Sequence, residues 1–405
     1  MPSVLTHLRI SFKFGLNIFS CSSFCYCVNK CLIYCLLVIV TVFGLRRVSR
    51  AAETNTANFP LYQTTRPNIT DLTIIYCGMS NRPAWTLDEL QPYVSYADRT
   101  TGKEEWLFDG FLFLEFKDGQ GAEFEEGWKQ KPAHKEQWQW LLNRFFEPGH
   151  AIPALETTIG NTEKRIGKPL RPRQVVITLP EPNHTQTDWG EIAGKQLNFT
   201  NPTDRIAACD WYIQAALEKW KQLAPAHLEL AGFYWIAESA PDSRKIILPE
   251  IGNHIRSNKL SFFWIPYWRS THSGDWKQLG FDVAYQQPNY FFHPELPLSR
   301  LQEACDFARQ HSMGMELELD GRLITDPQRF GSRLQPYLNA FETNGIKSSA
   351  AIAYYEGGGA FIKISKSEKP EHRQFYDRLA RWVLDRQDLA DRAVRNSKPA
   401  SGVNQ

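Results

Sequence analysis

Eight short, almost uninterrupted apolar segments recur along the chain, and they constrain its fold more than any other feature. They span residues 72–77, 110–116, 174–179, 228–237, 260–266, 281–285, 313–319 and 349–355. Strands that are apolar on both faces are typical of a parallel sheet that is buried between other layers. Because longer amphipathic segments lie between many of them, the sequence predicts an α/β fold.

The amphipathic segments predict the helices that connect these strands. Residues 134–146 place Trp138, Leu141 and Phe145 on one helical face. Further helices are expected over residues 204–223, 299–311, 326–345 and 371–392, and a single turn around residues 274–280. Cap candidates are Asn201 or Thr203, the capping-box pair Ser299 and Gln302, and Gly345.

Eight strands with crossover helices predict a (β/α)₈ or TIM barrel, formed as a single domain by residues 69–392 and followed by a disordered tail over 393–405. A doubly wound sheet is the alternative. No G-x-G-x-x-G or G-x-x-x-x-G-K-[ST] motif follows any of the apolar segments, so a nucleotide site is not expected.

Residues 1–52 predict a signal peptide or anchor. The apolar run 31–45 follows Lys30 and is shorter than the roughly 20 residues that span a membrane. Small residues allow cleavage near Ala51, whereas three arginines between 46 and 50 favour an uncleaved anchor as the alternative. The segment from Val28 onward resembles a signal's basic start, which suggests translation from Val28. We therefore expect a secreted or periplasmic protein.

The charge of the remaining chain argues against a nucleic-acid partner. Residues 1–51 hold six basic and no acidic side chains, which leaves 40 basic and 44 acidic side chains, or a formal charge of −4, in the rest of the chain. Such a body lacks the basic surface that binds phosphates. After signal cleavage no membrane contact is expected either. The oligomeric state stays open.

The cysteines and histidines predict neither disulfides nor metal. Five of the eight cysteines precede residue 52, and Cys77, Cys209 and Cys305 are widely separated, so we expect buried free thiols. His272 and His293 have no companion at the spacing of metal ligands. The sequence therefore predicts no metal and no cofactor.

Carboxylates at the ends of the fourth and seventh strands predict the chemistry, because barrel enzymes carry their active sites at the carboxyl ends of the strands. Glu238 follows a very apolar strand, whose surroundings raise the pKa of a carboxyl group and suit a general acid. Glu316 and Glu318 share a strand and a face. We expect one of them, preferably Glu318 nearer the mouth, to be the nucleophile. Glycosidases pair two carboxyl groups about 5–5.5 Å apart when retaining and about 6.5–9.5 Å apart when inverting.

Other side chains near the strand ends are candidates for binding sugar. Aromatic rings stack on sugars, and amides and carboxylates bind hydroxyl groups, although each ring also suits a core and each carboxylate also suits a cap or ion pair. Trp85 is a further possible sugar platform. The main candidates are Tyr76, Glu115, Glu181, Asn183, Trp235, Tyr267, Trp268, Arg269, Gln286, Asn289, Tyr354 and Glu356.

The segments IIYCG, LQPYVSYADRTTGKEEWLFDGFLFLEF, FYWIAES, FFWIPYW and GMELELD resemble family 4855 of domains of unknown function, a bacterial secreted family met among polysaccharide-degrading systems. The resemblance covers roughly residues 69–390 and implies a glycosidase-like TIM barrel. More widely, the chain resembles the retaining barrel glycosidases, in which an acid/base Glu ends strand four and a nucleophile Glu ends strand seven. Glu238 and either Glu316 or Glu318 match these positions, but Ala237 stands where that clan usually has Asn.

The sequence thus predicts a glycoside hydrolase that cleaves an extracellular or periplasmic polysaccharide or oligosaccharide with two carboxylates. A non-catalytic carbohydrate-binding barrel is the first alternative. A polysaccharide lyase is the second, with Arg269 neutralising a uronate, although the acidic body argues against an anionic substrate.

Overall fold

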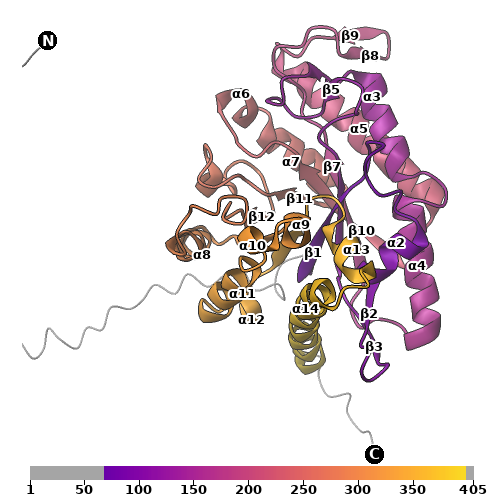
Figure 1. Ribbon diagram of the computed structural model, residues 1–405. Coiled ribbons are helices and arrows are strands. Elements are labelled where there is room, and N and C mark those ends of the chain that lie inside the picture. The colour runs from indigo at the N-terminus through magenta and orange to yellow at the C-terminus, as the bar shows by residue number, and fades with distance from the viewer. Residues whose placement is uncertain (1–67, 398–405) are drawn as a thin grey trace, which may run out of the picture. The chain divides into compact units, whose positions relative to one another are not determined.

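The computed structural model describes residues 68–397, and its centre is a closed barrel of eight strands (Figure 1). Each neighbouring pair of strands is parallel, and the barrel closes where the first strand pairs with the last. The strands are β1 (Asp71–Tyr76), β4 (Gly110–Leu114), β7 (Arg173–Leu179), β10 (Leu228–Trp235), β11 (Ser261–Trp264), β12 (Val283–Gln286), β13 (Gly314–Glu318) and β14 (Ile352–Tyr355). The predicted (β/α)₈ barrel is confirmed, and closure excludes the doubly wound sheet.

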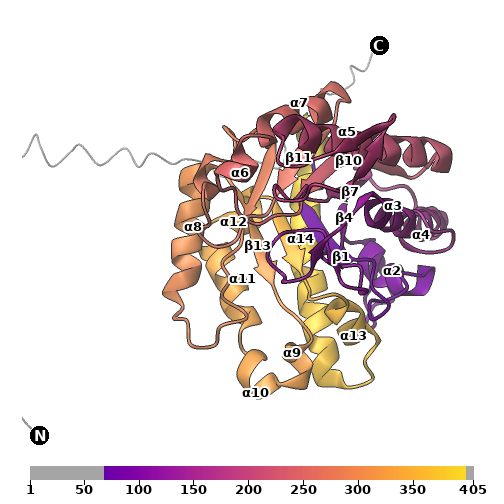
Figure 2. The ribbon, with the colours of Figure 1, turned by 90° about the horizontal axis from the view of Figure 1, so that it is seen from above.

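Helices surround the barrel, as the view from above in Figure 2 shows. Their bounds are α2 (Leu87–Val94), α3 (Lys135–Phe145), α4 (Ala151–Ile166), α5 (Pro202–Leu223), α6 (Asp242–Lys245), α7 (Leu248–Ser257), η1 (Ser273–Asp275), α8 (Ser299–His311), α9 (Arg322–Thr325), α10 (Pro327–Phe330), α11 (Leu334–Thr343), α12 (Ile346–Ser349), α13 (Ala360–Lys366) and α14 (Pro370–Ser397). The five predicted helical segments all contain helix. Asn201 caps α5 as expected, since its side chain accepts the amide of Thr203.

Two details of the helix prediction are wrong. The segment 326–345 is broken into α10 and α11, and the buried Arg333 side chain binds the carbonyl oxygens of Tyr290 and His293 at the break. The capping box at Ser299 does not form, because α8 begins after Leu298 and the Gln302 amide instead binds Asn344.

Within residues 68–397, three small two-stranded sheets lie in the loops outside the barrel. They are formed by β2 (Ser95–Ala97) with β3 (Glu104–Trp106), β5 (Ala122–Glu123) with β6 (Lys131–Pro132), and β8 (Gly190–Ile192) with β9 (Lys195–Leu197). The loop between β4 and α3 carries β5 and β6 and contributes Trp128 to a cavity at the carboxyl ends of the barrel strands.

Close packing of strands explains one glycine in the barrel wall. The register between β7 and β10 shifts between Leu230 and Gly232, which marks a β-bulge. A Cβ atom at Gly232 would stand 1.8 Å from the carbonyl oxygen of Ser261 on β11. Only glycine therefore allows β10 to approach β11 at this point.

The closing helix α14 is held to the start of β1 by buried charges. Arg386 donates to the Asp71 carboxylate at 2.6 Å, and both side chains are fully buried. Arg171 pairs with Asp109 nearby, and Asp109 also accepts the backbone amides of Thr70 and Asp71. These contacts fix the end of the barrel opposite the carboxyl ends of the strands.

The remaining predictions concern the ends of the chain and the thiols. The predicted signal or anchor over residues 1–52, with its start at Val28, lies outside the described residues. Helix α14 continues to Ser397, beyond the expected beginning of a disordered tail at residue 393. No described helix has the length and apolar character needed to cross a bilayer. Cys77, Cys209 and Cys305 are buried free thiols, as expected.

Candidate active site

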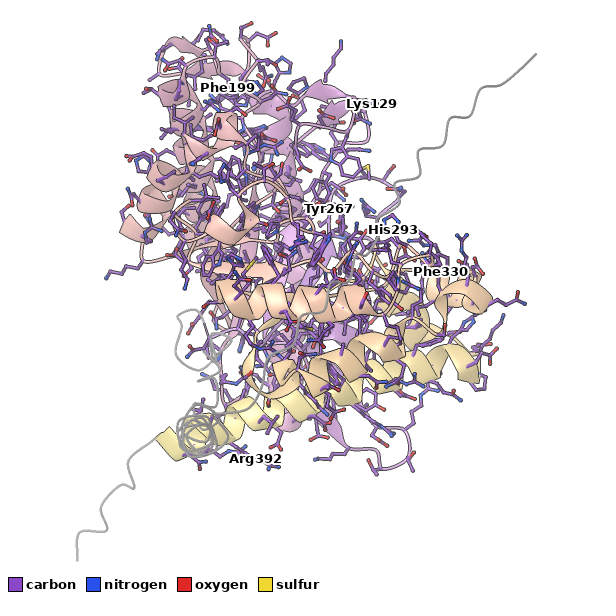
Figure 3. The ribbon with its side chains drawn as sticks, turned by 90° about the vertical axis from the view of Figure 1, so that its left-hand side faces the viewer. Lys129, Phe199, Tyr267, His293, Phe330 and Arg392 are labelled. Atoms are coloured by element: carbon purple, nitrogen blue, oxygen red, sulfur yellow. The ribbon has the colours of Figure 1, made fainter. Side chains whose placement is uncertain are left out.

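A cavity of about 310 Å³ opens at the carboxyl ends of the strands. Its walls come from β1, β4, β10, β13 and β14 and from the segments after β1, β4, β5, β10, β11, β12 and β14. In Figure 3, Tyr267 in the wall and Arg392 near the end of α14 lie far apart in the molecule. The lining side chains include Tyr76, Arg82, Glu115, Lys117, Trp128, Tyr234, Glu238, Tyr267, Gln287, Asn289, Phe292, Glu316 and Tyr355.

The structure brings Glu238 and Glu316 to the same cavity. Glu238 lies three residues beyond β10 and is half-buried, and Glu316 lies on β13 with only 3% of its surface exposed. The two carboxyl groups interact electrostatically, because a charge on Glu238 raises the pKa of Glu316. Acids from the fourth and seventh barrel strands therefore share one pocket.

Burial controls the protonation of this pair. It raises the pKa of Glu238, and a hydrogen bond of 2.9 Å from the Gln287 side-chain amide opposes that shift by stabilising the ionised form. Burial also raises the pKa of Glu316 well above its usual range, and the charges of Glu318 and Glu238 raise it further. These surroundings disfavour a charge on Glu316, whereas the Gln287 amide favours a charge on Glu238.

Glu318 does not line the cavity, which corrects the expectation that both acids of β13 project into the mouth. Its fully buried carboxylate accepts the backbone amides of Asn289 and Tyr290 at 2.8 and 3.1 Å and the hydroxyl of Tyr337. The segment after β12 covers Glu318, so sharing a face with Glu316 does not give it the same surroundings. Burial raises the pKa of Glu318 to about 7, while these hydrogen bonds oppose the shift.

Three tyrosines surround the deeper acid. Tyr76, Tyr234 and Tyr355 line the cavity, and burial raises the pKa of each, with the charge of Glu316 adding to the shift. Their hydroxyl groups are therefore neutral at physiological pH. They provide polar contacts in the interior without adding charge.

One side of the cavity carries an ion pair. Arg82 binds Glu115 through two hydrogen bonds of 2.7 and 2.9 Å, and its guanidinium lies 4.6 Å from the centre of the Tyr76 ring. Glu115 and Tyr76 line the cavity as the sequence suggested. Because Arg82 neutralises Glu115, this carboxylate is less suited to chemistry than Glu238 or Glu316.

Two exposed aromatic rings stand at the cavity. Tyr267 is 44% and Trp128 is 47% exposed, and both line it. The Tyr267 hydroxyl binds the side-chain amide of Asn289, another predicted residue in the wall. Trp128 was not predicted because it lies in the loop between β5 and β6, remote from any strand end in sequence. Exposed rings beside polar side chains suit the apolar face of a sugar.

Eight of the predicted binding residues lie outside the cavity wall. They are Glu181, Asn183, Trp235, Trp268, Arg269, Gln286, Tyr354 and Glu356. Trp85 also lies outside it, buried with its indole N–H on the Tyr76 carbonyl oxygen. The structure gives each of them another partner or a packing role.

The two acids among these residues support loops. Glu181 forms a buried ion pair with Arg244 and accepts the backbone amide of Glu126. Glu356 accepts the amides of Gly359 and Phe361 at the beginning of α13. Both side chains therefore form the cap or ion pair that is the alternative to sugar binding at a strand end.

The aromatic candidates point elsewhere. Trp235 is fully buried on the opposite face of β10 from Tyr234, where it packs against Phe262. Trp268 contacts the guanidinium groups of Arg269 and Arg300. Tyr354 donates its hydroxyl to Asp71 at 2.7 Å, so Tyr355 replaces it in the cavity wall.

The remaining polar candidates form local bonds. The Asn183 side chain accepts hydrogen bonds from the amide and the hydroxyl of Thr185, and these bonds form a turn within the loop after β7. The fully buried Gln286 donates to the carbonyl oxygen of Gln287, and Gln287 lines the cavity where Gln286 was expected. Within residues 68–397, no group of three or more His, Cys, Asp or Glu side chains is arranged to hold a metal ion.

A family model described as a domain of unknown function, DUF4855, matches residues 71–381. No curated protein matches the chain. Solved structures with a similar but distant fold include glycosidase barrels and other enzymes. A mutant tryptophan synthase α-subunit from Pyrococcus furiosus has 10% identity and a TM-score of 0.38, with 78% of this chain and 98% of that chain covered.

Two distant matches are glucanases. A hyperthermophilic endo-β-1,4-glucanase in complex with substrate has 10% identity and a TM-score of 0.38 and covers 74% of this chain and 96% of its own. A broad-specificity GH5-4 endoglucanase from an uncultured bacterium has 8% identity and a TM-score of 0.36, with coverage of 75% and 86%. Likenesses at this level concern the fold alone.

Proposed function

The chain belongs to the DUF4855 family of domains of unknown function, and from the residues of its cavity we propose that it is a glycoside hydrolase acting on a polysaccharide or oligosaccharide. One observation carries the proposal: Glu238 and Glu316 line the same cavity at the carboxyl ends of the barrel strands. Glycoside hydrolysis needs one carboxyl group that donates a proton and one that is ionised.

The surroundings of the two acids favour different roles. The Gln287 amide stabilises a negative charge on Glu238, whereas burial and two neighbouring carboxylates oppose a charge on Glu316. We therefore assign Glu316 as the proton donor and Glu238 as the nucleophile or general base. This reverses the roles expected from the retaining barrel glycosidases, and it agrees with the absence of Asn before Glu238.

The walls of the cavity fit an uncharged sugar ring. Tyr267 and Trp128 offer exposed aromatic surface, and Asn289, Gln287 and the tyrosine hydroxyls offer neutral hydrogen-bonding groups. Arg269, the cation expected for the lyase alternative, lies outside the wall, with its guanidinium 5.6 Å from the centre of the Trp268 ring, whereas Lys117 lines the cavity.

The test is cleavage of a panel of purified glycans, followed by the release of reducing ends. Glu238→Gln and Glu316→Gln should each lower kcat about 10³-fold or more while glycan binding and the melting temperature change little. Glu163→Gln on α4 is the control, since that carboxylate pairs with His227 outside the cavity. Glycan binding without any release of reducing ends would instead establish a non-catalytic carbohydrate-binding barrel.

Azide separates the two roles. With an activated aryl glycoside, a small nucleophile rescues a variant that has lost either carboxylate, and the configuration of the glycosyl azide identifies which one was lost. For a retaining enzyme we expect the inverted azide from Glu238→Gly and the retained azide from Glu316→Gly. The opposite pattern would exchange the two roles without removing the hydrolase assignment.

We also propose that the protein acts outside the cytoplasm, because residues 1–52 have a basic start, an apolar run and small residues near Ala51. Sequencing the amino terminus of protein recovered from the periplasm or medium tests this location. Recovery of the whole chain in the cytoplasm alone would contradict it.

A further inference from the structure

Glu125 connects the cavity acid Glu238 with the aromatic ring of Trp128. It lies in the loop between β5 and β6 and is only 9% exposed. One carboxylate oxygen accepts the backbone amide of Glu238 at 3.1 Å. The other accepts the indole N–H of Trp128 at 3.2 Å.

The nearby cation, Arg244, is paired with another carboxylate and not with Glu125. Burial of Glu125, together with the charges of Glu238 and Glu181, raises its pKa to about 8, although the hydrogen bond from the Glu238 amide and the charge of Arg244 oppose the shift. Arg244 is already paired with Glu181 through two hydrogen bonds of its guanidinium. The Glu125 carboxyl group accepts its hydrogen bonds from two N–H donors, the Glu238 amide and the Trp128 indole.

The backbone of Glu238 depends on this contact. Its carbonyl oxygen accepts the amide of Tyr267 at 2.9 Å and the hydroxyl of Ser270 at 2.7 Å. Its amide donates to Glu125. Glu125 therefore completes the set of bonds that hold the residue on which the proposed chemistry depends.

We propose that Glu125 is a positioning residue that couples the binding of a sugar on Trp128 to the placement of Glu238. The inference rests on the proposed function and adds a residue that acts through two others. A glycan that orders the Trp128 ring also orders its indole N–H, and the shared carboxylate transmits this order to the main chain of Glu238. Both contacts need oxygen acceptors, and the carboxyl group of Glu125 offers two oxygen atoms, one for each N–H donor.

Conservative variants test the coupling. In Glu125→Gln a single oxygen remains, so one N–H donor must face the new NH₂ group. Trp128→Phe keeps an aromatic ring and removes the indole N–H. We expect Glu125→Gln to lower kcat about 10-fold or more and to raise KM as much as Trp128→Phe does, and we expect the double variant to raise KM no further.

The controls separate this role from general loss of structure. Trp106→Phe should leave kcat and KM unchanged, because its indole N–H binds the Gly167 carbonyl oxygen outside the cavity. Glu125→Gln should also shift the fluorescence of the protein, and this shift should disappear in the Trp128→Phe background. Melting temperatures measured on all variants identify any that fail to fold.

Each outcome is decisive. Wild-type kcat and KM in Glu125→Gln, additive KM effects in the double variant, or no fluorescence shift assignable to Trp128 would overturn the coupling. A wild-type protein that releases no reducing ends would overturn the proposed function instead. The fluorescence measurement needs no substrate and still reports whether Glu125 holds the indole.

Discussion

The carboxylate of Glu318 accepts the backbone amide of Asn289 at 2.8 Å, so that a buried acid on β13 fixes a residue of the cavity wall. Asn289 has a positive φ of 50°, a conformation that costs a non-glycine residue energy. Its side chain binds the hydroxyl of Tyr267. Glu318 thereby supports one side of the cavity from behind, while Glu316, two residues earlier, faces into it.

We predict that Glu318→Gln destabilises the protein and only weakens activity. A glutamine has one acceptor for three donors, which leaves buried N–H or O–H groups unsatisfied at a cost of about 1–3 kcal/mol. Denaturant unfolding should show this loss, and kcat should fall less than about 100-fold. If Glu318→Gln abolished turnover as completely as Glu316→Gln without loss of stability, Glu318 would be the second reacting acid.

Neighbouring aromatic residues should differ in their effect on glycan binding. Tyr267 lines the cavity and is largely exposed, whereas Trp268 packs against Arg269 and Arg300 outside it. Tyr267→Ala should raise KM about 5- to 10-fold through the loss of stacking worth about 1 kcal/mol. Trp268→Ala should leave KM within about twofold, and an equal rise in both variants would mean that the ring of Tyr267 does not bind the sugar.

Stability should fall as the pH rises from about 5 to about 8.5. Burial raises the pKa of Glu125 to about 8 and those of Glu318 and Glu356 to about 7, all above the 4.5 of an unfolded glutamate. The native state therefore keeps protons that the unfolded state releases, and the stabilisation present below pH 4.5 is lost as the pH passes the native values.

Urea unfolding at pH 5 and pH 8.5 checks this dependence. The free energy of unfolding should be lower at pH 8.5 by at least about 1 kcal/mol, and Glu125→Gln should reduce the difference. A free energy of unfolding that is equal at the two pH values, or higher at pH 8.5, would contradict the prediction.

Removing the buried Arg386, which binds the Asp71 carboxylate and several backbone carbonyl oxygens, should cost far more stability than breaking an exposed ion pair. Replacing Arg386 with Met leaves the Asp71 carboxylate buried beside the hydroxyl of Tyr354 and the amide of Gln387 but without its cation. We expect a loss of about 3–5 kcal/mol in denaturant unfolding. Arg381→Ala, which breaks the exposed pair with Asp98, should cost less than about 1 kcal/mol and is the matched control.

The strands were predictable because a buried parallel strand leaves a continuous apolar segment in the sequence. Their ends were less so: the eighth segment begins at residue 349 in sequence, but the strand begins at Ile352. Since successive side chains of a strand point to opposite faces, an error of one residue in the expected register exchanges Tyr354 and Tyr355 at the cavity. Short helices such as α2 and α7 escaped prediction because few residues carry their pattern.

The candidate site was predictable only where a strand positions it. Glu238 and Glu316 follow from the topology, because the ends of strands four and seven meet at one end of the barrel. Trp128, Arg82 and Glu125 lie on loops, and their approach to the cavity depends on contacts across the fold. Glu318 is a similar case, since the segment after β12 determines its surroundings and the residues next to it in the sequence do not predict that contact.

The pairing of β1 with β14 has a consequence for synthesis on the ribosome. One edge of β1 can pair with β4 soon after both strands leave the ribosome. The other edge pairs with β14, in a register that joins Asp71 to Ile352, and stays unpaired until β14 has been synthesised. Until nearly the whole polypeptide has been translated, the nascent barrel exposes an apolar, unpaired edge. A truncated product that ends before β14 should therefore be a substrate for chaperones rather than a smaller folded protein.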